Sequence, residues 1–253
     1  MNTNKFYNNW FKKLQNKEYE PLLKAAQSHI SLCLSKEDIA GKKILDAGCG
    51  IGLNSISLAL NGADSVTGID ICKPAIEIAN RMAENYNVSK KINFQKMSMT
   101  DIEFEDESFD TVFAWGTICH TSDPLKSLAH LQRVTKKGGT IFINFYKWHW
   151  STPIHSTIRK IMSFLPAFTH ESISKILYYL MWPIFKIKKP GGRINNPWID
   201  IGDWFFVPIR YHYKPEDIIY NFTKNRFAIV DFLPKNARFE FSSQFYIKAK
   251  RIA

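Results

Sequence analysis

Short apolar segments and longer amphipathic segments alternate along residues 43–146. The apolar segments have the length of buried strands, and the segments between them repeat apolar residues every three or four positions, as one face of a helix does. The predicted strands are residues 43–47, 65–69, 92–96, 110–115 and 140–146, and the predicted helices are residues 53–61, 74–87 and 124–135. This alternation predicts a parallel sheet with right-handed crossovers and helices on both faces.

The alternation stops in residues 147–213, a segment rich in Trp, Pro, Tyr and Lys. We expect two helices there, at residues 156–165 and 171–182, and a turn at residues 190–193. The pattern then resumes with a helix at residues 215–225 and strands at residues 227–233 and 240–250. Residues 1–40 are predicted to be helical, with an aromatic stripe from Phe6 to Leu14 and a second helical run at residues 21–34.

Three glycines at alternate positions follow the first predicted strand, within the segment from Ile44 to Gly52. Such a turn lets backbone NH groups approach a ligand, and the next helix presents its positive dipole end to the same space. The dinucleotide fingerprint fits poorly, because Leu53 occupies its third small position and Asp46 would repel a pyrophosphate. Asp70 ends the next predicted strand, where a carboxylate can accept both ribose hydroxyl groups. These features predict an unphosphorylated nucleoside with a positive or zwitterionic tail.

Residues 44–52 together with Asp70 resemble the first two motifs of the class I S-adenosylmethionine (SAM) methyltransferases. Residues 99–101 resemble the adenine-contacting motif, residues 109–116 the fourth strand, and residues 137–143 the turn into the fifth strand. Lys137 departs from the proline that is frequent there in relatives. The resemblance covers residues 41–146.

The resemblance implies an α/β fold with a doubly wound, mostly parallel, seven-stranded Rossmann-like sheet whose last strand is antiparallel. It divides the chain into an N-terminal helical lid (residues 1–40), a SAM-binding core (41–146), an inserted, mainly helical cap for the substrate (147–213) and the C-terminal completion of the sheet (214–253). The N-terminal aromatic stripe either packs against the sheet edge or belongs to a helix that covers the cofactor.

The cofactor SAM would be held by residues at the carboxyl ends of the strands, where ligands bind in open α/β sheets. Asp70 would hold the ribose and Asp101 the adenine amino group, while Asp46 would organise the turn or face the ammonium group. Trp115 either contacts the sulfonium through its ring face or packs under the cap. The predicted cofactor-binding set is Asp46, Gly48, Cys49, Gly50, Asp70, Ile71, Thr100, Asp101 and Trp115.

A hydroxyl acceptor needs a base, and His120 lies just beyond the fourth predicted strand. Histidine, with an unperturbed pKa of about 6.5, suits this role at neutral pH; the alternative is a structural hydrogen bond that holds the loop. Residues 115–121 resemble the W-G-x-x-H-H-T loop of a bacterial branch of the family, many of whose members modify sugars, surface polysaccharides or natural products. Cys119 replaces the first of its paired histidines. The predicted substrate-binding residues are Tyr146, His149, Arg193, Trp204, Arg210 and His212.

The net charge of +11 lies almost entirely in the second part of the chain. Residues 1–146 hold 17 basic and 16 acidic residues, whereas residues 147–253 hold 17 basic and 7 acidic residues. This asymmetry favours an anionic partner, for which the candidates are a phosphorylated or carboxylated substrate, RNA and an acidic membrane. The alternative is that the excess of basic residues serves solubility alone.

The four cysteines and seven histidines show no metal-site spacing, so we expect reduced thiols and no metal. The polar N-terminus lacks a signal-peptide core and no apolar run reaches the ~20 residues of a membrane span, which predicts a cytoplasmic protein.

The sequence therefore predicts a SAM-dependent methyltransferase acting on an oxygen, nitrogen or sulfur atom of a small, anionic or sugar-type acceptor. The alternatives are an RNA methyltransferase, a peripheral membrane enzyme acting on a lipid-linked substrate and a non-catalytic SAM-binding protein. We expect no tight binding to bulk RNA or acidic vesicles at physiological salt. The acceptor and the oligomeric state stay open.

Overall fold

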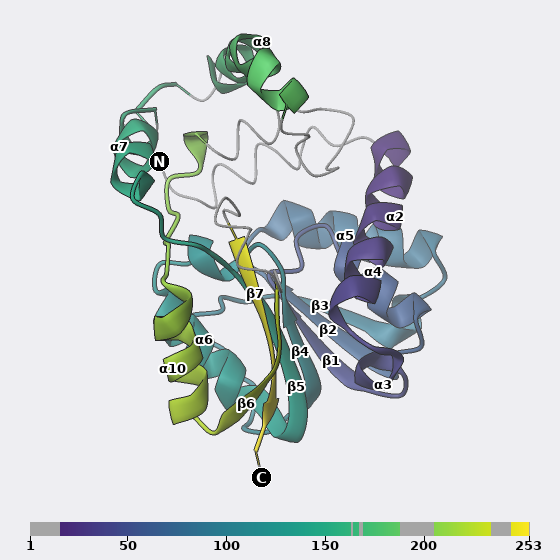
Figure 1. The fold of residues 1–253 in the computed structure, drawn as a ribbon. Coiled ribbons are helices and arrows are strands. Elements are labelled where there is room, and N and C mark those ends of the chain that lie inside the picture. The colour runs from purple at the N-terminus through teal and green to yellow at the C-terminus, as the bar shows by residue number, and fades with distance from the viewer. Residues whose placement is uncertain (1–15, 163, 167–168, 188–204, 234–243, 253) are drawn as a thin grey trace.

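A computed structural model describes residues 16–162, 164–166, 169–187, 205–233 and 244–252 (Figure 1). The aromatic stripe from Phe6 to Leu14, the turn at residues 190–193, and the predicted substrate residues Arg193 and Trp204 lie outside these ranges.

The described residues form one seven-stranded sheet with the strand order β3-β2-β1-β4-β5-β7-β6. Strands β1 to β5 run parallel, and β7 is antiparallel to both of its neighbours, β5 and β6. The strands are β1 (Lys43–Ala47), β2 (Ser65–Asp70), β3 (Ile92–Lys96), β4 (Phe109–Ala114), β5 (Thr135–Tyr146), β6 (Phe227–Leu233) and β7 (Gln244–Arg251). The predicted doubly wound sheet with an antiparallel last strand is thereby confirmed.

Helices cover both faces of this sheet (Figure 1). One face carries α2 (Asn16–Cys33), α3 (Lys36–Ile39), α4 (Leu53–Leu60) and α5 (Lys73–Asn85), and the other carries α6 (Pro124–Val134) and α10 (Pro215–Lys224). Successive strand residues point to opposite faces. In β4, Phe113 joins the core under α2 and α4, whereas Val112 and Ala114 join the core under α6 and α10.

Strand β5 begins earlier than the sequence pattern predicts, at Thr135 rather than at Thr140. Thr135 pairs with Phe109, and the register then shifts before Thr111 pairs with Thr140. Gly139 fits this irregular stretch because a Cβ there would lie 2.8 Å from the Lys136 carbonyl oxygen. The two glycines at 138–139 therefore form a bulge inside the strand, where we expected a turn before it.

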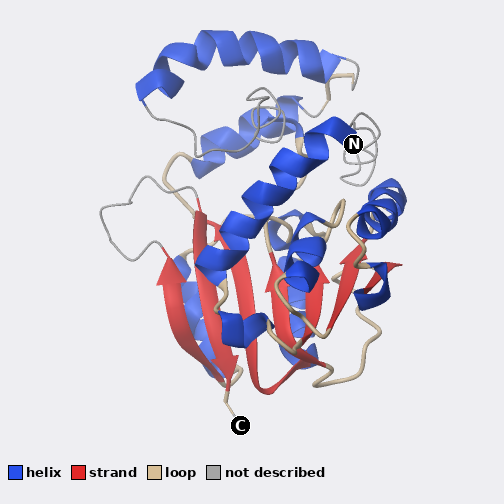
Figure 2. Ribbon diagram, turned by 90° about the vertical axis from the view of Figure 1, so that its right-hand side faces the viewer, coloured by secondary structure: helices blue, strands red, loops and turns tan. Residues whose placement is uncertain are grey.

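Helices α7 (Thr152–Met162) and α8 (His170–Ile187) stand over the carboxyl ends of the parallel strands (Figures 1 and 2). The two ends of this inserted region run side by side, because Lys147 forms a parallel bridge with Tyr213. Tyr213 N donates to the Tyr146 carbonyl at 2.9 Å, and Trp148 N donates to the Tyr213 carbonyl at 2.8 Å. The bridge anchors the region to the end of β5.

The described part of the N-terminal region packs along the sheet face that carries α4. Tyr19 of α2 donates from its hydroxyl to the Ile51 carbonyl in the glycine turn at 3.1 Å, and its ring is buried. Within the described ranges, no helix combines the length and the apolar character needed to cross a membrane.

Candidate active site

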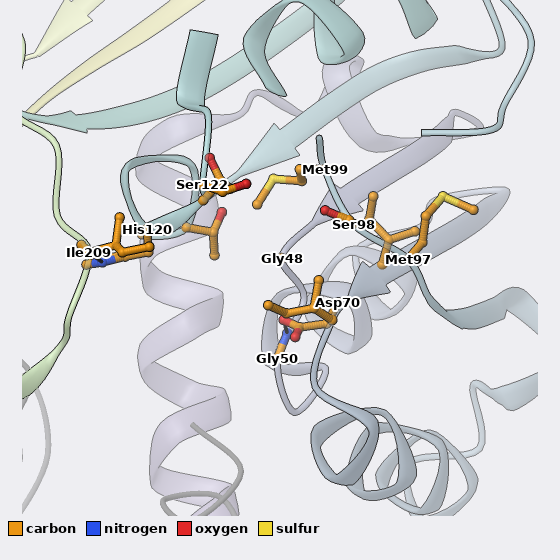
Figure 3. A pocket seen from close by; sticks show the side chains of 14 residues that line it. Gly48, Gly50, Asp70, Met97, Ser98, Met99, His120, Ser122 and Ile209 are labelled. Carbon is orange, nitrogen blue, oxygen red and sulfur yellow. Dashed lines mark hydrogen bonds between the residues drawn. The ribbon is translucent and has the colours of Figure 1, made fainter. Parts of the chain in front are cut away.

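A cavity of about 330 Å³ lies at the carboxyl ends of β1, β2 and β4 (Figure 3). Its walls come from the glycine turn after β1, the end of β2, the loop after β3, the loop after β4 and one residue that follows the inserted helices. The lining residues are Gly48, Gly50, Ile69, Asp70, Ile71, Met97, Ser98, Met99, Gly116, Thr117, His120, Thr121, Ser122 and Ile209. Asp70 and the methionines lie on one side of this space, and His120 and Ile209 lie on the other (Figure 3).

The backbone NH groups of the glycine turn are bonded to β2, although we expected them to face a ligand. Gly48 N and Cys49 N both donate to the Ile69 carbonyl, at 2.8 and 3.0 Å, and Gly50 N donates to Asp70 Oδ2 at 2.9 Å. These bonds satisfy buried donors and fasten the turn to β2. The turn therefore contributes a fixed cavity wall.

Gly48 is required by a close approach of the loop after β4. Its φ is +79°, and a Cβ there would overlap the side chain of Thr117. Thr117 is itself held, since its hydroxyl donates to the Ala47 carbonyl at 3.0 Å.

We expect Gly48→Ala to lower the free energy of unfolding by more than Gly62→Ala does. Gly62 has a φ of +92° with no atom within 4 Å of a Cβ, so it reports the backbone strain alone, about 1–2 kcal/mol. The clash with Thr117 adds roughly another 1–3 kcal/mol. Urea unfolding of both variants measures the difference, and equal losses would mean that Thr117 moves away without cost.

The Asp70 carboxylate is fixed at the end of β2 by two backbone donors. Gly50 N donates to Oδ2 at 2.9 Å and Cys72 N donates to Oδ1 at 2.8 Å. Burial raises the pKa of Asp70 despite these two bonds, which lower it. Each carboxylate oxygen can accept a further hydrogen bond from the cavity side. Ile71, 39% exposed, lines the cavity beside it.

Asp46 and Cys49, both in the predicted cofactor set, are buried and do not line the cavity. Asp46 is 1% exposed, and its Oδ2 accepts from the Ser55 hydroxyl at 2.6 Å. Its Oδ1 is buried without a hydrogen-bond partner, and burial raises its pKa to about 7. Of its two predicted roles, organising the turn fits this position, because the bond to Ser55 joins β1 to α4.

Asp46 should make wild-type stability fall as pH rises. A carboxyl whose pKa is about 7 when folded, against about 3.9 unfolded, keeps its proton in the folded protein while the unfolded chain loses it. Between those values stability falls by up to about 1.4 kcal/mol per pH unit. Asp46→Asn should remove this slope, which urea unfolding at about pH 5 and about pH 7 measures. Equal slopes in the two proteins would contradict the assignment.

Thr100 and Asp101 also lie off the cavity, which corrects the predicted adenine contact. Asp101 N donates to the Ser98 carbonyl at 3.1 Å, and the two hydroxyls of Ser98 and Thr100 lie 2.8 Å apart. This tight turn leaves Asp101 exposed and places Ser98 and Met99 in the wall instead.

Trp115 packs on the sheet face that carries α2, away from the cavity lining. Its ring stacks on His29 at 5.0 Å and on Tyr246 at 5.1 Å between centroids. The alternation of side chains in and beyond β4 explains this, because Trp115 lies two residues after Phe113 and shares its face. Trp115 therefore packs against α2 and β7 and not under the cap, and it does not line the cavity, where the sulfonium contact was expected.

His120 ends the short turn η2 (Ile118–His120), is buried and lines the cavity. Its Nδ1 lies 2.7 Å from the Ile209 carbonyl oxygen. Because a carbonyl only accepts, Nδ1 carries the hydrogen and Nε2 is the acceptor of the neutral ring. The Tyr146 hydroxyl lies 3.4 Å from Nε2 and donates to it. The two roles considered for His120 are thus compatible, because Nδ1 can hold the loop while Nε2 acts as the base.

Three of the predicted substrate residues come together beside His120. The Arg210 guanidinium lies over the Tyr146 ring, 4.2 Å from its centroid, and the His212 ring lies 5.9 Å from that of Tyr146. His149 lies at the start of the inserted region, with Nδ1 3.0 Å from the Ser151 hydroxyl.

Sequence reasoning missed Arg159, which is 4% exposed on α7. Burial is the largest cause that lowers the pKa of His212 to about 4, and the basic groups Arg159, Arg210, His120 and His155 contribute to the same shift. No sequence pattern distinguishes Arg159, because an arginine on an amphipathic helix looks the same whether it faces solvent or a neighbouring segment. Among the described residues, no group of His, Cys, Asp or Glu is arranged to hold a metal ion.

Residues 45–143 match the family model described as "Methyltransferase domain". A ubiquinone biosynthesis O-methyltransferase of Pseudomonas syringae pv. tomato is 29% identical over 157 residues, which are 61% of this chain and 66% of the relative. The chain thus spans just under two thirds of that relative's length.

Two solved structures share the fold. A SAM-dependent methyltransferase of Methanosarcina mazei gives a TM-score of 0.57 at 22% identity, covering 88% of this chain and 97% of the other. Magnesium protoporphyrin IX methyltransferase of Synechocystis PCC 6803, crystallised with bound SAM, gives 0.55 at 16% identity, covering 90% of this chain and 79% of the other. The matched domain, the order of the motifs and the sheet topology show that residues 45–143 form a class I SAM-dependent methyltransferase domain.

Proposed function

We propose that the protein transfers the methyl group of SAM to an oxygen atom of a small molecule, with His120 as the general base. The observation that carries this proposal is the orientation of the His120 ring. The Ile209 carbonyl holds Nδ1, so the acceptor nitrogen is Nε2, on a ring that lines the cavity opposite Asp70. The similarity to O-methyltransferases supports oxygen over nitrogen or sulfur as the acceptor atom.

The residues of the cavity fit a nucleoside cofactor. The Asp70 carboxylate is pre-oriented by Gly50 N and Cys72 N, and it retains acceptor capacity for ribose hydroxyls. Ile71, Met97 and Met99 supply an apolar wall that suits a purine ring. Bound SAM supplies an electrophilic methyl group on a sulfonium, which leaves as a neutral thioether.

The chain's own contribution is to position the acceptor and take up its proton. His120 Nε2 accepts the hydroxyl proton while Nδ1 stays bonded to Ile209, so the ring keeps its orientation as it becomes charged. The Tyr146 hydroxyl lies 3.4 Å from Nε2, so an acceptor hydroxyl that reaches this nitrogen has to replace that contact. Ser122 and Thr121 complete the cavity wall on the same side.

The test is a methyl-transfer screen with the full chain, SAM and a panel of phenols, catechols and hydroxy acids, read out as S-adenosylhomocysteine (SAH). We expect SAH to form with oxygen nucleophiles and not with the corresponding methyl ethers. SAH formation with amines alone would overturn the choice of acceptor atom. Tight SAM binding without turnover on any acceptor class would favour the non-catalytic alternative.

A second candidate, a peripheral membrane enzyme acting on a lipid-linked acceptor, is favoured by exposed apolar side chains on the inserted region. Ile154, Ile158 and Ile161 share one face of α7 and are 56%, 38% and 63% exposed, and Trp150 is 72% exposed. Sedimentation with vesicles rich in phosphatidylglycerol separates the two candidates. The small-molecule proposal expects no binding at physiological salt, and binding that Ile158→Asp abolishes would favour the second candidate.

A further inference from the structure

The His120 ring is held at both of its nitrogens by a closed set of contacts. Its Nδ1 lies 2.7 Å from the Ile209 carbonyl oxygen, and its Nε2 lies 3.4 Å from the Tyr146 hydroxyl. The residue after Ile209 is Arg210, whose guanidinium lies over the Tyr146 ring, 4.2 Å from its centroid. Two consecutive residues therefore contact the histidine on one side and its tyrosine partner on the other.

The Tyr146 side chain is fixed by the fold. Tyr146 ends β5 and is 6% exposed. Its backbone N donates to Cys119 Sγ at 3.5 Å, and its carbonyl accepts from Tyr213 N at 2.9 Å. Its ring meets the His120 ring in a T-shaped arrangement, with the centroids 5.4 Å apart and the planes at 76°. The direction of the Tyr146 hydroxyl is thus set by contacts of its backbone and its ring.

We propose that Tyr146 is a positioning residue, whose hydroxyl holds Nε2 of His120 in place until the hydroxyl of the methyl acceptor replaces it. The hydrogen bond from the tyrosine to Nε2 breaks as the bond from the acceptor to Nε2 forms. The inference rests on the proposed function, because Nε2 needs positioning only if it takes up a proton. It also differs from the role predicted for Tyr146 from the sequence, which is a contact with the substrate.

The geometry of the contact suits a partner that is later displaced. A general base has to lie within about 2.6–3.2 Å of the atom whose proton it takes, so its orientation matters. One hydrogen bond at Nδ1 leaves the His120 ring some freedom to tilt, and a second contact at the opposite nitrogen restricts that freedom. At 3.4 Å, the tyrosine contact is longer than an ordinary hydrogen bond from a hydroxyl, so an acceptor that comes closer can replace it.

Tyr146→Phe tests the role because it removes the hydroxyl and keeps the ring that contacts His120 and Arg210. We expect kcat to fall about two- to tenfold, the range of one neutral hydrogen bond, on any acceptor that the wild-type protein methylates. The KM for the acceptor should not rise, because the variant lacks the group that competes for Nε2. An unchanged kcat, with or without a raised KM, would overturn the proposal, and a raised KM would restore the substrate contact.

Tyr211→Phe is the matched control, because it removes a hydroxyl that contacts the same loop without contacting the base. The Tyr211 hydroxyl donates to the Ser122 carbonyl at 3.3 Å. This substitution should leave kcat and KM unchanged. Equal losses of kcat in Tyr211→Phe and Tyr146→Phe would indicate general loosening of the loop and would overturn a specific role for Tyr146.

NMR of the full chain with isotope-labelled histidine tests the contact without turnover, in the presence and absence of SAH. The ring-nitrogen resonances report which nitrogen carries the hydrogen and whether the other accepts a hydrogen bond, and the spectrum of His120→Asn identifies the signals of His120. We expect Tyr146→Phe to keep the hydrogen on Nδ1 and to shift the Nε2 resonance toward that of a free acceptor. Tyr211→Phe should shift neither resonance. An Nε2 resonance that is the same in Tyr146→Phe and the wild type would contradict the proposal.

The two proposals fail in different ways. Loss of activity in His120→Asn, together with wild-type kinetics in Tyr146→Phe, would remove the positioning role and leave His120 as the base. Full activity in His120→Asn would instead remove the base from the proposed function, and with it the role of Tyr146, even if NMR shows the contact. The proposal predicts that His120→Asn is inactive and that Tyr146→Phe is slowed and shows the shifted Nε2 resonance.

Discussion

His120→Ala should lower kcat by about 10²- to 10⁴-fold on any acceptor that the wild-type protein methylates, with SAM affinity nearly unchanged. This is the usual contribution of a general base, which acts on the proton only in the transition state. The His120 ring lies across the cavity from Asp70, so removing it leaves the residues on the Asp70 side in place (Figure 3). Single-turnover kinetics at saturating SAM, with calorimetry for SAM binding, measures both quantities.

Two controls separate the base from a structural role. His130→Ala removes a histidine of α6 that does not line the cavity and should leave kcat unchanged. His120→Asn preserves a hydrogen-bond donor toward the Ile209 loop and removes the basic nitrogen, so it should be as inactive as His120→Ala. Recovery of activity in His120→Asn would return His120 to holding the loop, the alternative considered from sequence.

Asp70→Ala should weaken SAM binding by about 10- to 100-fold. Hydrogen bonds with a charged partner contribute about 1.5–3 kcal/mol, which corresponds to that range in the dissociation constant. The substitution also removes the acceptors of Gly50 N and Cys72 N, so part of the loss comes from loosening of the glycine turn.

Asp70→Asn addresses that complication because its amide oxygen still accepts one of the two backbone bonds. We expect it to keep a near-wild-type melting temperature and to bind SAM more weakly than the wild type does. Asp64→Ala, an exposed acid just before β2, is the matched control and should bind SAM normally. Wild-type affinity in a folded Asp70→Ala protein would contradict the ribose assignment.

The sequence predicts the strands well because each strand is a short apolar segment bounded by turn residues, and both features are local. β1, β3 and β6 have the predicted bounds, β2 ends one residue later than predicted, and β4 begins and ends one residue earlier. The early start of β5 was not predicted because its first residues, 135–139, are polar and glycine-rich. Only their pairing with β4 makes them part of the strand. Such pairing depends on a partner that lies elsewhere in the sequence.

The predictions for the candidate site were likewise correct where local sequence determines the position of a residue. Gly48, Gly50, Asp70, Ile71 and His120 line the cavity as predicted, because motif position and strand end together fix where they lie. Trp115 and Asp101 do not line the cavity. Trp115 follows the end of a strand and Asp101 lies in a four-residue turn, and the direction of a side chain in such places depends on local hydrogen bonds.

The cluster around Tyr146 shows a second limit of sequence reasoning. Tyr146, Arg210 and His212 were each predicted as substrate residues, but the contacts of Tyr146 with His120, Arg210 and His212 join segments far apart in the chain. Arg159 is buried on α7, a helix whose predicted start lay four residues too late. Long-range packing alone brings these side chains together.

A structure of the protein with SAH bound tests the central claim most directly. The account predicts the ribose hydroxyls on the Asp70 carboxylate, the purine against Met97 and Met99, and the thioether sulfur directed toward the side of the cavity that carries His120. SAH bound elsewhere, or bound here with its sulfur turned away from His120, would contradict the account.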